Sequence, residues 1–142
     1  MRAVVQRVTE AEVTVQGSST GSIQNGLVVL LGVEDGDTKK DADYIADKVS
    51  GLRIFDDSEG VMNLSVSDIG GGILSVSQFT LLADARKGKR PSYSKAARPE
   101  AAKELYDYFN TKIEEKGITV GKGIFQAEML VKIYNDGPVT IL

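Results

Sequence analysis

The chain of 142 residues has no histidine, no cysteine and no tryptophan, and it has only three prolines. Without histidine it cannot form a Ser-His-Asp triad, an imidazole base near neutral pH or a histidine-bound metal site. Without cysteine it has no thiolate nucleophile, no disulfide and no cysteine-bound zinc. Any catalysis would therefore use backbone groups, hydroxyls, carboxylates or the substrate itself, and we expect no metal ion.

Long hydrophobic runs are also missing. The longest, from Leu27 to Leu31, is much shorter than the about 20 residues that a membrane-spanning helix needs. Gln6 and Arg7 interrupt the apolar N-terminal stretch, which therefore does not look like a signal peptide. The hydrophobic content of 42% and the charged content of 26% are ordinary for a globular protein. We expect a single cytoplasmic domain over residues 1–142, without a membrane partner.

One segment contains no acidic residue. Residues 86–98 hold six basic side chains, namely Arg86, Lys87, Lys89, Arg90, Lys95 and Arg98. With +6 in this segment and −3 overall, the rest of the chain carries a formal charge of −9. A basic loop on an acidic body is a candidate site for phosphate contacts, and the alternative is a solvated loop without a partner.

Hydrophobic periodicity predicts two helices among many strands. The first helix begins at Thr38, with Asp41 in a near capping-box arrangement, and Gly51 is the expected residue just beyond its end. The second begins at Pro99 and ends at Lys116-Gly117. Strands are expected over residues 2–8, 12–16, 22–24, 27–33, 52–55, 73–82, 119–124, 128–134 and 139–142. Two helices cannot cover both faces of so many strands. We therefore expect an α+β fold, with a strongly curved, largely antiparallel sheet or partly closed barrel packed against two helices.

Near the C-terminus, Asn135-Asp-Gly-Pro138 forms a stiff polar turn between apolar strands. Pro138 has a fixed φ and no N–H, while Gly137 permits backbone angles closed to other residues. A Gly-Pro unit can present carbonyl groups outward with little freedom, although the segment taken alone also fits an ordinary turn. Arg7 lies inside the first strand pattern, where it is either an edge residue reaching water or a partly buried donor to a carbonyl turn such as Gly137-Pro138.

The strand over Ser75-Val-Ser-Gln-Phe-Thr80 mixes polar and apolar side chains on both faces. Free N–H groups at a strand end, with hydroxyls nearby, can stabilise an oxyanion. The alternative is a sheet edge whose hydroxyls face water. The segment by itself does not decide between these interpretations.

Seven motifs together resemble the D-aminoacyl-tRNA deacylase family from end to end. They are Met1-Arg-Ala-Val-Val-Gln-Arg-Val8, Leu31-Gly-Val33, Asn63-Leu-Ser65, Ser77-Gln-Phe-Thr80, Leu82-Ala-Asp84, Lys87-Gly-Lys-Arg-Pro-Ser92 and Asn135-Asp-Gly-Pro-Val-Thr140. Each motif is weak alone, but their joint occurrence in this order and at this spacing is specific.

The resemblance implies a homodimeric enzyme without a cofactor, with active sites at the subunit interface. Such enzymes hydrolyse the ester between a D-amino acid and the 3′-terminal adenosine of tRNA. Ser77, Gln78, Phe79 and Thr80 would match the catalytic motif. Gly137 and Pro138 would match the Gly-cisPro motif, contributed by the second subunit and held in place by Arg7. Rejection of L-residues by a rigid carbonyl pair works by exclusion, so glycyl-tRNA would also be hydrolysed.

The remaining matches lie at the pocket rim and in the basic loop. Phe125, Ala127 and Met129 would bind substrate, and Arg86, Lys87, Lys89 and Arg90 would contact tRNA. Where the family often has Phe-Gly-Ala, this chain has Gln126 in the middle, which we interpret as tolerated variation.

Three alternatives stay open at this point. The protein could be a non-catalytic RNA-binding protein that uses residues 86–98, although that loop offers only Tyr93 as a stacking ring. It could also be a small-molecule binding protein. Within the enzyme interpretation, either Thr80 or the tRNA 2′-OH assists proton transfer, and we prefer the 2′-OH.

Overall fold

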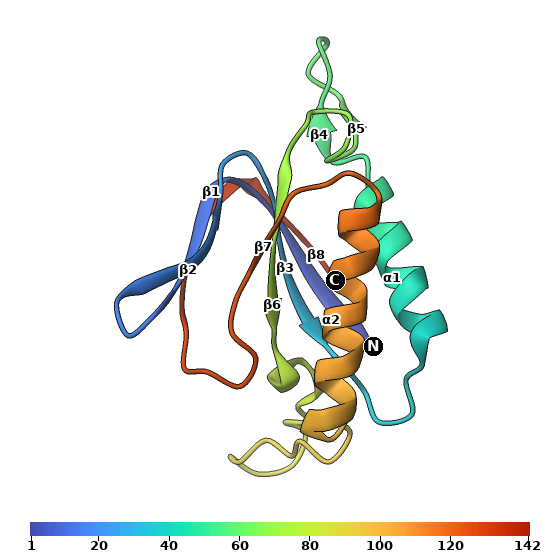
Figure 1. The fold of residues 1–142 in the computed structure, drawn as a ribbon, viewed down its shortest axis with the longest axis vertical. Coiled ribbons are helices and arrows are strands. Elements are labelled where there is room, and N and C mark those ends of the chain that lie inside the picture. Colours follow the sequence, from blue (N-terminus) through green and yellow to red (C-terminus); the bar gives the residue numbers. More distant parts are fainter.

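The structure is a computed structural model that describes all 142 residues. Its elements, in chain order, are β1 (Arg2–Val15), β2 (Ser18–Ile23), β3 (Gly26–Gly32), α1 (Lys39–Gly51), β4 (Phe55–Asp56), β5 (Met62–Leu64), β6 (Gly72–Ser77), the 3-10 helix η1 (Phe79–Leu82), α2 (Pro99–Glu115), β7 (Val120–Lys122) and β8 (Leu130–Ile141). Figure 1 shows the two helices side by side against the sheet, with the β4–β5 hairpin and the basic loop at opposite ends. No helix is both long and apolar enough to cross a membrane.

The main sheet is mixed and has the order β2-β1-β3-β6-β7, with β8 paired to β1 (Figure 1). Strand β1 is antiparallel to β2, β3 and β8, whereas β3, β6 and β7 run parallel to one another. One long strand therefore carries three partners along its length. This arrangement confirms the predicted α+β class with a curved, nearly closed sheet on two helices.

Strand β1 is continuous, so the expectation of separate strands at 2–8 and 12–16 is wrong. The polar residues Thr9 and Glu10 continue the strand as its exposed stretch, and the pairing with β8 shifts register nearby. The strand expected at 22–24 begins earlier, at Ser18, and ends at Ile23. Gln16 and Gly17 alone form the loop, both with positive φ, as a two-residue hairpin requires.

The barrel nearly closes where β2 meets β7. The Thr20 hydroxyl donates to the Lys122 carbonyl oxygen at 3.1 Å, but no hydrogen-bonded ladder joins the two strands. A Cβ atom at Gly21 would lie 2.6 Å from the Lys122 nitrogen. Only glycine therefore permits this close approach of the two edge strands.

Two apolar clusters fill the faces of the sheet. Leu27, Val29 and Leu31 point into a cluster of 15 buried residues between the sheet and the helices. Val28 points the other way, into a cluster of seven buried residues enclosed by the curved sheet. The continuously apolar β3 is thus buried on both faces, as the sequence predicts.

Both helices follow the sequence closely. Thr38 and Asp41 form the predicted capping box, and Pro99 is the first residue of α2. Gly51 is the last residue of α1 rather than a residue beyond its end. The short strand expected at 52–55 starts only at Phe55 and pairs with β5, an element that the sequence pattern did not predict.

The C-terminal strands also differ from expectation. The strand predicted at 119–124 is only Val120–Lys122. Those predicted at 128–134 and 139–142 are one strand, β8, interrupted in register around residues 135–140. The strand predicted at 73–82 stops at Ser77, since the chain turns into η1 before Leu82.

Candidate functional site

The end of β6 presents free backbone donors. Gln78 donates its N–H to the Leu31 carbonyl at 2.8 Å, which fixes the point where β6 turns into η1. The first N–H groups of a helix have no acceptor within it, and here they belong to Phe79 and Thr80. This geometry fits an oxyanion site built from backbone alone.

The side chains of this turn are joined to one another. The Gln78 amide donates to the Thr80 hydroxyl oxygen at 2.6 Å. No carboxylate or amine accepts a hydrogen bond from that hydroxyl, so Thr80 has no base that would make it a strong nucleophile.

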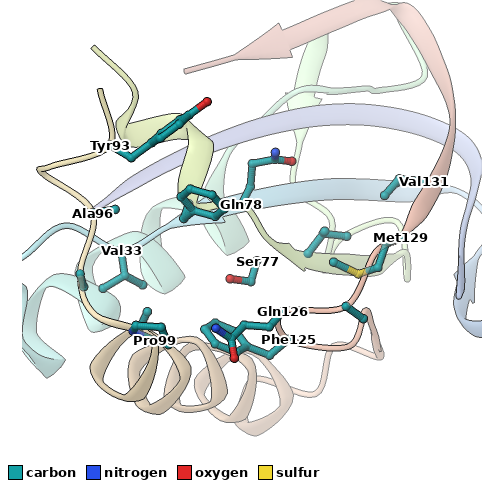
Figure 2. A pocket seen from close by; sticks show the side chains of 15 residues that line it. Val33, Ser77, Gln78, Tyr93, Ala96, Pro99, Phe125, Gln126, Met129 and Val131 are labelled. Atoms are coloured by element: carbon teal, nitrogen blue, oxygen red, sulfur yellow. The ribbon is translucent and has the colours of Figure 1, made fainter. Parts of the chain in front are cut away.

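A largely apolar cavity of about 620 Å³ lies next to this turn (Figure 2). It is lined by Val33, Val76, Ser77, Gln78, Phe79, Tyr93, Ala96, Ala97, Pro99, Ala102, Phe125, Gln126, Ala127, Met129 and Val131. The structure thus brings together six of the predicted site residues from β6, η1 and the segment before β8. Thr80 lies just outside the lining, at the same turn.

Several lining residues escaped sequence reasoning. Val33, Tyr93 and Pro99 lie across the cavity from Met129 in Figure 2, and Ala102 of the first turn of α2 also lines the cavity. The apolar face of α2 gave a signal for burial, but nothing in the pattern indicated that its first turn borders a cavity. No charged side chain lines the cavity, so it cannot neutralise a substrate charge from its own walls.

Gln126 occupies a backbone conformation that favours glycine. Its φ is +64°, in the left-handed region, and its side chain is exposed. This conformation explains why a glycine suits the middle of the Phe125–Ala127 triplet. The exposure of the side chain at the cavity explains why glutamine is accepted there.

The Asn135–Thr140 segment forms a loop that is held by internal hydrogen bonds, at the other end of the sheet from the Ser77–Thr80 turn. The Gly137–Pro138 peptide bond is cis. The Asn135 side chain accepts from the Val139 N–H at 2.9 Å and donates to the Thr140 hydroxyl at 2.8 Å. These bonds span the loop and hold its shape.

Arg7 fastens this loop to the neighbouring hairpin. Its guanidinium donates to the carbonyl oxygens of Asp136 at 3.1 Å and Ile54 at 2.8 Å. Carboxylates of Asp56 and Asp136 lie 3.6 Å away, and the side chain is only 12% exposed. Arg7 is therefore the partly buried donor to a carbonyl turn, and the carbonyl it holds precedes Gly137.

The two predicted halves of the site lie far apart within one chain. Arg7 pairs with Leu27 of β3, whereas Ser77 pairs with Leu31. Four residues along a strand correspond to about 13 Å, before any sideways distance is added. Gly137 sits beside Arg7 and therefore cannot reach the Ser77–Thr80 turn of its own chain.

Backbone hydrogen bonds join the two ends of the basic loop, and an acidic residue at its start neutralises one of its cations. Asp84 and Ser92 exchange two backbone hydrogen bonds, of 2.8 and 2.9 Å. Arg86 binds the Asp84 carboxylate through two nitrogens, at 2.9 and 2.6 Å, and this pair lowers the pKa of Asp84 to about 2. Lys87, Lys89 and Arg90 form no ion pair within the chain. Three of the four predicted tRNA contacts are thus free cations, and Arg86 is not.

Comparison with known proteins identifies the class to which this fold and site belong. A sequence profile for D-Tyr-tRNA(Tyr) deacylase matches residues 4–142. A D-aminoacyl-tRNA deacylase of Koribacter versatilis is 59% identical over all of this chain and 95% of its own length. One from Brevibacillus brevis is 56% identical, over all of this chain and 98% of its own.

Solved structures agree on the fold. One described as c-Myc DNA Unwinding Element Binding Protein has a TM-score of 0.93 and 41% identity, covering 99% of this chain and 96% of its own. A probable eukaryotic D-amino acid tRNA deacylase has a TM-score of 0.82 at 16% identity, covering 98% and 96%, and shows the fold alone.

The chain belongs to the D-Tyr-tRNA(Tyr) deacylase family. It is a hydrolase acting on the ester bond of aminoacyl-tRNA, as the resemblance of its motifs implies. The alternatives of a non-catalytic RNA-binding protein and a small-molecule binding protein are therefore set aside.

Proposed function

We propose that this protein hydrolyses D-aminoacyl-tRNA and glycyl-tRNA, and spares L-aminoacyl-tRNA, at a site shared by two copies of the chain. The N–H groups of Phe79 and Thr80 would bind the ester carbonyl. Gly137-Pro138 of the second copy would face them. The observation that carries this proposal is the register of β3, which places Arg7 and Ser77 four residues apart along that strand. This corresponds to about 13 Å before any sideways distance is added.

In the proposed reaction, water attacks the ester carbonyl and the bond to the 3′-oxygen of the terminal adenosine breaks. The negative charge that develops on the carbonyl oxygen is stabilised by the two backbone N–H groups. The neighbouring 2′-OH relays a proton from the water to the leaving 3′-oxygen. The products are a free D-amino acid and tRNA. Thr80 is not the nucleophile in this scheme, because no base contacts its hydroxyl.

Stereochemical selection would come from exclusion. The cavity has no charged wall, so the α-ammonium group needs carbonyl oxygens from elsewhere, and the loop at Gly137-Pro138 supplies rigid ones. A carbonyl pair that fills the space of an L-side chain rejects every L-residue, whatever its size. Glycine has no side chain to exclude, so its ester is hydrolysed too.

The tRNA body would lie along Lys87, Lys89 and Arg90, outside the cavity. These cations carry no internal ion pair and are exposed. The cytoplasmic location expected from the sequence fits this substrate and stays a prediction.

The first test compares D-tyrosyl-tRNA with L-tyrosyl-tRNA and glycyl-tRNA. Hydrolysis of the D-ester and the glycyl ester, with the L-ester spared, is expected. Equal rates on the two tyrosyl esters would refute the selection by exclusion, and no hydrolysis of the D-ester would refute the activity.

The second test asks whether one site draws on two chains. Thr80→Pro removes one N–H donor, and loss of such a donor costs about 100- to 1000-fold in kcat. Thr80→Val keeps the N–H and serves as the matched control. Gly137→Ala disables the other half of the site.

Mixing Thr80→Pro and Gly137→Ala proteins after joint refolding should restore activity to roughly a quarter of the wild-type value. Half of the dimers are then mixed, and each holds one intact site. Absence of any recovery in mixtures shown to contain mixed dimers would refute the shared site.

A further inference from the structure

Two aromatic rings from distant segments meet at the rim of the cavity. The Phe79 and Tyr93 ring centroids lie 5.2 Å apart with an interplanar angle of 67°. Phe79 is 56% exposed and Tyr93 41% exposed, and both belong to the cavity lining. An edge-to-face pair leaves at least one face of each ring uncovered by the other. The cavity thus has an open aromatic ledge on one side.

The ledge formed by Phe79 and Tyr93 borders both the cavity and the basic loop. In Figure 2 the Tyr93 ring lies across the cavity from Phe125 and Gln126. Tyr93 directly follows Ser92, whose backbone closes the loop that carries Lys87 and Lys89. Tyr93 therefore lines the uncharged cavity directly where the cationic loop ends in the chain.

This order of features matches the way single-stranded nucleic acid is bound. Cations contact the phosphates, while aromatic faces stack on the bases without regard to sequence. A chain that enters the cavity with its terminal nucleoside must cross the rim to reach the cations. With the terminal adenosine in the cavity, as the proposed function requires, the nucleotide at the crossing would be the one immediately before it.

We propose that the Phe79–Tyr93 ledge is a stacking site for the base of the penultimate nucleotide of the tRNA 3′ tail. This inference rests on the proposed function, which brings the ester to the Phe79–Thr80 turn. The ledge acts before the chemical step, by holding the tail so that the ester carbonyl stays at the backbone donors. The sequence alone indicated only Tyr93 as a stacking ring, and the structure adds Phe79.

The test compares two substrates with the same ester, D-tyrosyl-tRNA and 3′-O-D-tyrosyl-adenosine, which lacks the penultimate nucleotide. Tyr93→Leu should raise the KM for D-tyrosyl-tRNA about 5- to 150-fold more than that for D-tyrosyl-adenosine, which corresponds to about 1–3 kcal/mol. Tyr93→Phe keeps a ring and should retain the wild-type ratio of the two KM values. Tyr44→Leu, at a 62% exposed ring on α1, is the matched control and should not change the ratio.

Two results would overturn the inference. An equal rise of KM for both substrates in Tyr93→Leu would mean that the ring is only a cavity wall, and no rise for either would mean that nothing stacks there. Should Tyr93→Leu fail to fold, Tyr93→Trp decides, because a larger ring should keep or lower the KM for D-tyrosyl-tRNA and a rise would count against stacking.

The proposed function is tested separately by the wild-type protein. Failure of the wild type to hydrolyse either D-ester would refute the activity itself. Wild-type hydrolysis of both esters, with an unchanged KM ratio in Tyr93→Leu, would refute the ledge alone.

Discussion

Arg7 holds the carbonyl oxygen of Asp136 at 3.1 Å while the same guanidinium binds the Ile54 carbonyl at 2.8 Å. One side chain from the middle of β1 therefore joins the loop before Gly137 to the base of the β4–β5 hairpin. The geometry makes Arg7 a positioning residue for the loop, since it touches neither the cavity nor the Ser77–Thr80 turn.

Arg7→Gln should lower the free energy of unfolding by about 1.5–3 kcal/mol, because hydrogen bonds to a charged donor are lost at a side chain that is mostly buried. D-ester hydrolysis should fall as well. Urea unfolding and a deacylation assay check both. Lys132→Gln, which removes an exposed cation 3.8 Å from Glu12, is the control and should change little. An Arg7→Gln protein as stable and active as the wild type would contradict this prediction.

Gly137 has both a positive φ and close neighbours. Its φ is +129°, and an added Cβ would lie 2.8 Å from the Val139 side chain and 3.1 Å from an Arg7 nitrogen. Gly137→Ala should therefore reduce stability and displace the loop, with loss of deacylation. Gly60→Ala is matched, because Gly60 has φ +76° and open space around it. It should show only the backbone cost, about 1–2 kcal/mol, with activity retained. Equal activity of the two variants would argue against a role for the loop.

Asp84 should titrate unusually low. Hydrogen bonds from Arg86 lower its pKa from 3.8 to about 2, so the folded protein favours the carboxylate. The contribution of this pair to stability is thus fully present above pH about 4 and is lost as the pH falls through about 2. NMR titration of the Asp84 carboxyl should show this low midpoint, and Arg86→Gln should raise it. An identical midpoint in both proteins would exclude Arg86 as the cause.

Replacing Lys87, Lys89 and Arg90 together by Gln should weaken tRNA binding and flatten its salt dependence. Each lost phosphate contact lowers the magnitude of the log–log slope by about 0.7–0.9. The control removes three other cations instead, Lys103 and Lys112 of α2 and Lys116 directly after it, which already pair with carboxylates. If both triple variants shift the slope equally, binding depends on net charge and not on the loop.

Gln126→Gly should stabilise the protein by about 0.5–1 kcal/mol, because relief of a left-handed conformation exceeds the entropy cost of glycine. Gln24→Gly, at an exposed glutamine without a positive φ, should be destabilising. Thermal unfolding should show that the stability changes of the two variants have opposite signs.

The helices were predictable because their signals are local. Thr38 and Asp41 satisfy backbone donors at the start of α1, and Pro99 has no N–H to leave unpaired at the start of α2, whatever the rest of the chain does. The end of β6 was not predictable in this way. Leu81 and Leu82 continue an apolar pattern that a strand and a 3-10 turn share, so the turn at Gln78 depends on its hydrogen bond to Leu31.

The site was predictable in part for a similar reason. The two motifs at Ser77–Thr80 and Gly137-Pro138 were found from their resemblance to a family. The meeting of Phe79 with Tyr93 depends on how the Asp84–Ser92 loop folds back, which is set by the two backbone hydrogen bonds between Asp84 and Ser92. The hydrophobic periodicity of the sequence does not predict such a contact.

The two walls of the cavity differ in stiffness because β2 and β7 touch at Gly21 and Lys122 without a hydrogen-bonded ladder. Strand β6 is clamped between β3 and β7, whereas β7 has a ladder on one side only and leads directly to Phe125 and Met129. Thermal breathing of the barrel should therefore begin where β2 and β7 touch, and amide protons of β7 should exchange with solvent sooner than those of β6. The wall that carries the Ser77–Thr80 turn should stay fixed, while the opposite wall can yield to side chains of different bulk.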